Sequence, residues 1–115
     1  MMKLAMYVAG GYLFVSMSIF AQSPQTFTGE IMDSQCAALG GHQVMMKKGE
    51  SAKDCTDRCV KLGGQYALVD PATHTVYQLD DQKKPATFAG SKVKVTGTLN
   101  ASTKTIHVTD IKAGS

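Results

Sequence analysis

Residues 92–99, KVKVTGTL, alternate apolar and polar side chains, and this pattern limits the fold of the chain more than any other. Its apolar residues Val93, Val95 and Leu99 fall on one face. A period of two is typical of a half-buried β-strand. The segment 105–111, TIHVTDI, has the same pattern and follows a polar turn. The two segments therefore predict a β-hairpin at the end of the chain.

Three further strands are predicted before this hairpin. Residues 26–33 have a period of two, and residues 66–70 and 75–80 are short apolar runs that flank a turn opened by Asp-Pro. Such a turn predicts a second hairpin. Residues 83–90 form the connector to the last hairpin, with room for one helical turn.

The order of these elements predicts a mainly β protein, a five-stranded OB-like Greek-key barrel. The region between the first and second strands is then a helix-containing insert, and OB folds use this loop for ligands. Gly97 within a strand fits a barrel corner or a bulge. An open antiparallel sheet with one helix packed on it is the alternative fold.

The first 21 residues have the composition of a secretory signal peptide. Lys3 is followed by an apolar stretch that ends in Ala21-Gln22. A basic start, an apolar middle and a small residue at the cut are typical of such a leader. We expect cleavage after Ala21, a single domain over residues 22–115 and a secreted or periplasmic location. A retained membrane anchor is the alternative, but no basic stop-transfer flank follows the stretch.

The charge and aromatic content of the expected domain bear on its partners. The chain has 12 Lys and Arg against 9 Asp and Glu, so loss of Lys3 leaves only a small positive excess. Such a balance predicts no strong attraction to nucleic acid or to an anionic membrane. The aromatic residues outside the leader are too few to stack bases once the core is filled; they are Phe27, Tyr66, Tyr77 and Phe88. We expect no nucleic acid partner and no stable membrane anchor after cleavage.

All three cysteines lie within residues 36–59, and two of them fall on a predicted helix. Ser51 is a capping residue, and Gly63-Gly64 is a stop signal, so residues 52–62 are expected to be helical. Cys55 and Cys59 are then one turn apart on a stripe shared with Ala52 and Leu62. The β-carbons of such neighbours lie about 5–6 Å apart, which is too far for an unstrained disulfide.

Three arrangements of the cysteines follow from this spacing. Cys36 can form a disulfide with Cys55 or Cys59, which an oxidising compartment favours. A metal site of Cys36, His42, Cys55 and Cys59 uses the odd cysteine and the histidine together, because three Cys and one His form a known zinc set. Simple packing of small buried thiols is the third.

The type of metal depends on which other ligands join. Cysteine and histidine suit Zn(II), whereas a thioether from Met45 or Met46 favours Cu(I). Asp33 and Ser34 either cap the turn after the first strand or offer a hydrogen bond to a liganding histidine.

The chain has no motif that indicates catalysis. It has no glycine-rich phosphate loop and no serine in a nucleophile elbow, and a Cys36–His42 dyad lacks an orienting group. His74 in a turn and His107 on an outward strand face are expected to be surface residues. We therefore expect a binding or structural domain and no enzyme.

The phrases FTGEIMDSQC, CTDRCVKLGGQYALVD, VYQLDDQ and FAGSKVKVTGTL, followed by TIHVTDI, resemble a family of small exported bacterial proteins of unknown function. The resemblance covers nearly all of residues 26–111. It implies a single OB-like domain with an Asp-Ser-x-Cys element, a nearby His with Met and a Cys-x3-Cys pair. It implies no activity.

Overall fold

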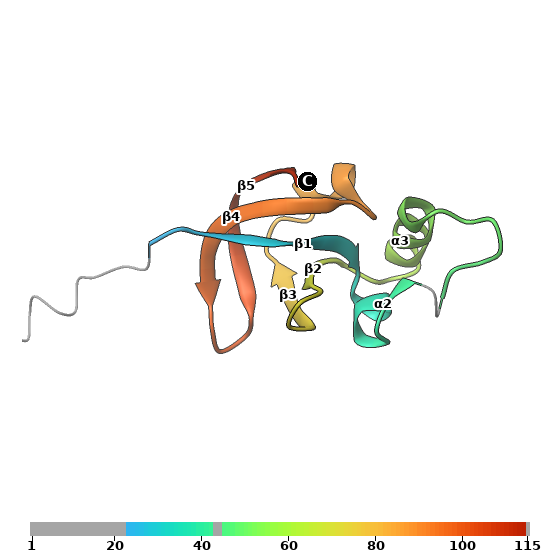
Figure 1. Cartoon of the computed structure of the whole chain (residues 1–115), viewed down its shortest axis with the longest axis horizontal. Coiled ribbons are helices and arrows are strands. Elements are labelled where there is room, and N and C mark those ends of the chain that lie inside the picture. Colours follow the sequence, from blue (N-terminus) through green and yellow to red (C-terminus); the bar gives the residue numbers. More distant parts are fainter. Residues whose placement is uncertain (1–22, 43–44, 115) are drawn as a thin grey trace, which may run out of the picture.

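Five strands form one sheet that closes on itself in a ring (Figure 1). The structure is a computed structural model that describes residues 23–42 and 45–114. The strands are β1 (Gln25–Asp33), β2 (Tyr66–Asp70), β3 (Thr75–Leu79), β4 (Lys92–Asn100) and β5 (Thr105–Ala113). The helices are α2 (Ser34–Ala38), α3 (Ala52–Lys61) and the 3-10 helix η3 (Lys84–Phe88). The predicted mainly β fold is confirmed, and the open sheet is not found.

The strands follow the order β1-β2-β3-β5-β4 around the ring. β1 pairs with two strands: its first part pairs with β4 and its last part pairs with β2. The ring closes between β3 and β5 through a short parallel pairing, in which Leu79 lies opposite Ile106. The other neighbouring strands are antiparallel.

The inward residues of the strands fill the ring. Its buried core consists of Ile31, Leu68, Leu79, Val93, Val95, Ile106, Val108 and Ile111. The four aromatic residues outside the leader are partly buried and pack against this core. Gly97 lies beside a bulge in β4, as predicted, and a Cβ there would be 2.1 Å from the carbonyl oxygen of His107.

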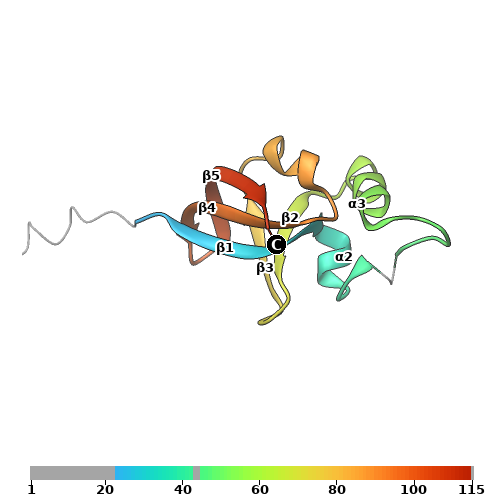
Figure 2. The same cartoon turned by 45° about the horizontal axis from the view of Figure 1, so that its top comes forward.

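Both α-helices lie at one end of the ring, and the β4–β5 turn lies at the other (Figure 2). α3 begins as predicted, because the Ser51 hydroxyl accepts a hydrogen bond of 3.1 Å from the amide of Asp54. Its C-cap is Leu62, whose side chain is 71% exposed. The helical spacing placed Leu62 on one stripe with Cys55 and Cys59, but Leu62 lies at the end of the helix and is not buried with them.

The predicted signal peptide, residues 1–21, lies outside the described residues, so the domain limits of 22–115 stay a prediction. Within residues 23–42 and 45–114, no helix combines the length and the hydrophobicity that a membrane span requires.

Candidate metal site

The first part of the site is the junction of β1 and α2. The Asp33 side chain caps α2 by accepting hydrogen bonds from the amides of Gln35, at 2.9 Å, and Cys36, at 3.3 Å. Asp33 is fully buried, as is Cys36. The amide of Ser34 donates to the carbonyl of Gln65 at 2.7 Å, which ties this junction to the start of β2. Cys36 is therefore held in place by backbone contacts on both sides.

The second part of the site is the inner face of α3. Cys55 and Cys59 are fully buried on this face, one turn apart. The helix is fastened to β2 by the Tyr66 hydroxyl, which donates to Asp57 at 2.9 Å. Burial raises the pKa of Tyr66 to about 12, and the Asp57 carboxylate adds to this shift. The phenol therefore keeps the proton that makes this contact.

The thiols meet in two overlapping groups that share Cys36. In one group, the ligand atoms of Cys36, His42 and Cys55 all lie within 4.8 Å of one another. In the other, those of Asp33, Cys36 and Cys59 do so. All of these residues are buried, and Met32 completes the apolar cluster around the sulfurs. Cys36 is thus the centre of the site, with Cys55 on one side and Cys59 on the other.

His42 reaches the thiols from the loop after α2. Its Nε2 pairs with the Glu30 carboxylate, while Nδ1 is buried and has no hydrogen-bond partner within residues 23–42 and 45–114. Gly40 and Gly41 precede it with φ of 98° and 148°; φ of 98° is a conformation that favours glycine. The two glycines therefore let the chain turn just before His42.

The side chain that pairs with His42 comes from β1 and not from Asp33 or Ser34. Of the two roles considered for Asp33 and Ser34, capping is the one found, because Asp33 caps α2 and the Ser34 hydroxyl accepts from the amide of Gln65 at 3.1 Å. Glu30 of β1 makes the contact with His42 instead. Its position on an outward face of β1 gave no signal of this contact in the sequence.

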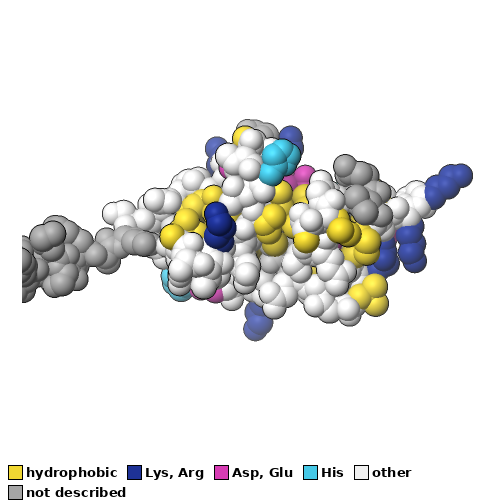
Figure 3. All heavy atoms as spheres, turned by 90° about the horizontal axis from the view of Figure 1, so that it is seen from below, with side chains coloured by type: hydrophobic (Ala, Val, Ile, Leu, Met, Phe, Trp, Pro, Cys, Tyr) yellow, Lys and Arg dark blue, Asp and Glu magenta, His cyan; other side chains and the backbone are white. Residues whose placement is uncertain are grey.

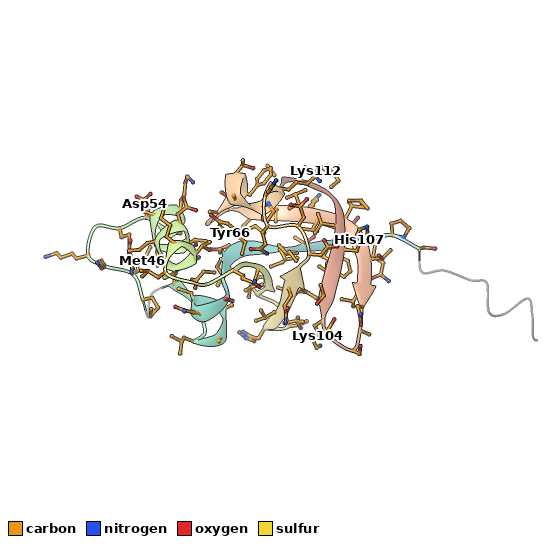
Figure 4. All side chains as sticks on the ribbon, turned by 180° about the vertical axis from the view of Figure 1, so that it is seen from behind. Met46, Asp54, Tyr66, Lys104, His107 and Lys112 are labelled. Atoms are coloured by element: carbon orange, nitrogen blue, oxygen red, sulfur yellow. The ribbon has the colours of Figure 1, made fainter. Side chains whose placement is uncertain are left out.

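Arg58 holds the loop that leads from His42 to α3. Its guanidinium donates to Glu50 at 2.8 and 3.0 Å and to the carbonyl of Met45 at 2.9 Å. The hydrogen bonds from Arg58, followed by the one from the Lys47 amide, lower the pKa of Glu50 to about 2. Met45 and Met46 are partly buried and pack against the thiol cluster. In Figure 4, Met46 lies next to α3, at the end of the molecule opposite His107.

All three cysteines are free thiols, and no pair is joined by a disulfide. The predicted disulfide from Cys36 to α3 is therefore not present, although Cys36 does lie beside the helix. Burial raises the pKa of Cys36 well above its usual value, and the neighbouring Asp33 carboxylate raises it further. Burial also raises the pKa of Cys59. At neutral pH these thiols keep their protons, and an ion that binds them must displace the protons.

The four residues predicted as metal ligands thus converge on one region. Cys36 meets His42 and Cys55 in one group and Cys59 in the other, so the four do not form one group of mutual neighbours. His74 and His107 are exposed, as expected. Sequence reasoning missed the approach of Asp33 to the sulfurs.

Exposed positive charge lies at the outer edge of this region. Lys and Arg side chains gather at the end of the molecule where the loop before α3 lies (Figure 3). Lys47 and Lys48 of this loop are exposed. Their side chains face solvent, whereas the three thiols are buried.

Residues 58–114 match the model of a family of proteins of unknown function, DUF5818. The matched part includes Cys59 and β2 to β5 but not Cys36, His42 or Cys55. Neither the curated proteins nor the solved structures include a match to this chain.

Proposed function

We propose that this protein is an exported, OB-like metal-binding domain that holds Zn(II) or Cu(I) at Cys36, His42 and Cys55, with Cys59 within reach as a further ligand. The observation that carries this proposal is the state of His42. Nε2 is bound to Glu30, Nδ1 is buried without a partner among the described residues, and a nitrogen of this ring lies within 4.8 Å of the Cys36 and Cys55 sulfurs. An unpaired buried nitrogen costs about 1–3 kcal/mol, and an ion would satisfy it.

The contact between Glu30 and His42 has the form found around metal-bound histidines. In such histidines, the ring nitrogen that does not bind the metal donates its N–H to a carboxylate. This hydrogen bond fixes the tautomer and makes the other nitrogen a better ligand. In neutral His42, a proton on Nε2 that is shared with Glu30 leaves Nδ1 as the electron-pair donor. The chemistry of two sulfurs and one imidazole suits Zn(II) and Cu(I).

A binding role is favoured over a catalytic one by the state of the thiols. A cysteine nucleophile needs a lowered pKa and access to substrate. The pKa values of Cys36 and Cys59 are raised, and both side chains are fully buried. We therefore propose that the site is not that of a thiol enzyme.

The OB-like assignment and the export are parts of the same proposal. The assignment is supported by the closed ring of five strands and by a site in the loop between β1 and β2, where OB folds bind ligands. Export rests on the basic and apolar start of the chain and implies loss of residues 1–21. The domain is then released from the membrane into the periplasm or the medium, and we propose no nucleic acid partner.

A second candidate function is a structural or interaction module without a cofactor. The complete burial of Cys36, Cys55 and Cys59 next to Met32 favours it, because small buried thiols also serve as plain packing. In that case the cluster is a second, smaller core that fixes α2 and α3 against the ring.

Metal analysis of the exported product separates the two functions. The full chain is expressed in an exporting bacterium, purified anaerobically from the periplasm or medium, and examined for thiols, bound metal and mass. We expect three thiols, one metal equivalent and an N-terminus at Gln22. Cys36→Ser and His42→Ala should each weaken Zn(II) binding roughly a hundredfold, whereas the matched control His107→Ala should not change it.

Two results would contradict the metal-binding function. A folded product with three reactive thiols that takes up neither Zn(II) nor Cu(I) in stoichiometric amount would leave the structural module as the function. Equal affinity of the wild type and a His42→Ala, Cys59→Ser double variant would exclude the metal site.

A further inference from the structure

We infer that the ion of this site is Cu(I), bound by Cys36, His42 and Cys55 and covered by the thioethers of Met45 and Met46. This inference rests on the proposed metal-binding function and names its ion. It also assigns Cys59 a supporting place beside the ligands.

The first reason for Cu(I) is the number of ligand atoms that lie close together. Structural zinc sites take four ligands in a tetrahedron. Here three ligand atoms lie within 4.8 Å of one another in the group of Cys36, His42 and Cys55, whereas Cys59 lies within this distance of Cys36 and Asp33 and does not belong to that group. A four-ligand zinc site would need Cys59 to approach both His42 and Cys55, because it shares no group with either. A three-coordinate ion needs no such movement.

The surroundings of this three-ligand group are the second reason. Met32 forms one buried cluster with the three cysteines, and Ala37, Met45, Met46 and Val69 pack against this cluster with apolar surface and thioether sulfur. Thioethers are soft ligands that select Cu(I), whereas Zn(II) is held by Cys, His, Asp or Glu. An apolar cover also keeps away a water molecule that would complete a zinc tetrahedron.

The attachment of the methionine segment is the third reason. Arg58 of α3 donates to the carbonyl of Met45, and Glu50 accepts from both Arg58 and the amide of Lys47. The amides of Met45 and Met46 both donate to the carbonyl of His42, at 3.0 and 2.8 Å. Both methionines are thereby fastened to His42, and Met45 is also fastened to the cysteine helix, which holds this segment against the thiol cluster.

Thiolates bind Cu(I) tightly in almost any arrangement, so affinity for Cu(I) alone does not test the inference. The test uses a Met45→Leu, Met46→Leu double variant, because a Met-to-Leu exchange keeps the volume and removes only the thioethers. Cu(I) affinity is measured anaerobically by competition with a chromophoric Cu(I) chelator, and Zn(II) affinity by competition with a zinc indicator. X-ray absorption of the Cu(I)-loaded wild type gives the ligand number.

We expect the double variant to bind Cu(I) about tenfold more weakly, a loss comparable to that of a supporting metal contact, with no change for Zn(II). Cys59→Ser should keep Cu(I) affinity within about threefold, and the spectrum should show sulfur and nitrogen ligands in a site of low coordination number. Zn(II) bound by three sulfurs and one nitrogen, with equal Cu(I) affinity in the wild type and the Met variant, would overturn this inference and leave the metal-binding function standing. Binding of neither metal would overturn both.

Discussion

His42 uses its two ring nitrogens in different ways. Nε2 pairs with Glu30, whose side chain is 27% exposed, while Nδ1 is buried and has no hydrogen-bond partner in the part of the chain that the structure describes. The carboxylate thus works as a positioning group for the ring. Because Glu30 touches none of the sulfurs in the groups of ligand atoms, its effect on an ion must pass through the imidazole.

This arrangement predicts that Glu30→Gln weakens metal binding without removing a ligand. An amide at this position no longer attracts the Nε2 proton as strongly, so Nδ1 becomes a poorer donor. We expect a loss of about tenfold in Zn(II) or Cu(I) affinity, measured by competition with a chromophoric chelator. Asp54→Asn, at an exposed acidic residue of α3, is the control and should bind as the wild type does. An unchanged affinity in Glu30→Gln would show that the pair does not position the ring.

At the scale of elements, α3 is the part to which the rest of the site is attached. Its inner face presents Cys55 and Cys59, and Arg58 on the same helix holds the Met45–Glu50 loop. The short helix α2 brings Cys36 to it, with Asp33 as the cap. Gly64 follows α3 where a Cβ would lie 3.1 Å from the Asp33 carboxylate. Two helices therefore enclose the thiols from opposite sides.

The contact between Arg58 and Glu50 predicts an acid-sensitive attachment of this loop. The pKa of Glu50 falls from 4.5 to about 2 in the folded protein, chiefly because Arg58 donates to it. A carboxyl group with a lowered folded-state pKa stabilises the fold when ionised. Its contribution is present above about pH 4.5 and is lost as the pH falls towards 2.

Thermal unfolding at several pH values between 5.5 and 2.5 measures this contribution. Glu50→Gln cannot lose it on acidification, so the Tm of the variant should fall less than that of the wild type over this range. Asp110→Asn, at an exposed position on β5, is the matched control and should follow the wild type. Identical falls in Tm for the wild type and Glu50→Gln would argue against the attachment.

At the scale of the whole molecule, the site depends on closure of the ring. β1 ends at Asp33 and β2 begins at Tyr66, and these two residues are register partners. The ends of the long loop that carries the site are therefore fixed by the sheet. The ring itself closes through β5, which pairs with β4 along its length and with β3 over a short parallel stretch.

Gly97 is the position where this closure is most sensitive. A Cβ there would lie 2.1 Å from the carbonyl oxygen of His107 on β5, and backbone cannot yield as a flexible side chain does. We expect Gly97→Ala to lower the free energy of unfolding by about 2 kcal/mol or more, measured by urea denaturation. Thr98→Ala, on the next residue of β4, should cost less than about 1 kcal/mol. Equal effects of the two substitutions would mean that the bulge tolerates a side chain.

Much of the secondary structure followed from local patterns. The alternation in residues 92–99 predicted β4, the cap at Ser51 predicted the start of α3, and Gly97 predicted the bulge. Each of these signals acts over a few residues, because side-chain period, helix capping and backbone sterics are local effects. Leu62 was misplaced for the same reason, since a helical period does not say where the helix leaves the sheet.

The sequence by itself determined which groups were available: three cysteines, one nearby histidine and two methionines in a segment between two strands. Only the tertiary structure decided their partners. That Cys36 lies between Cys55 and Cys59, that Glu30 takes one nitrogen of His42 and that Arg58 holds Met45 all depend on contacts between residues far apart in the chain. Such contacts arise from how strands and helices pack, and no local pattern of residues encodes that packing.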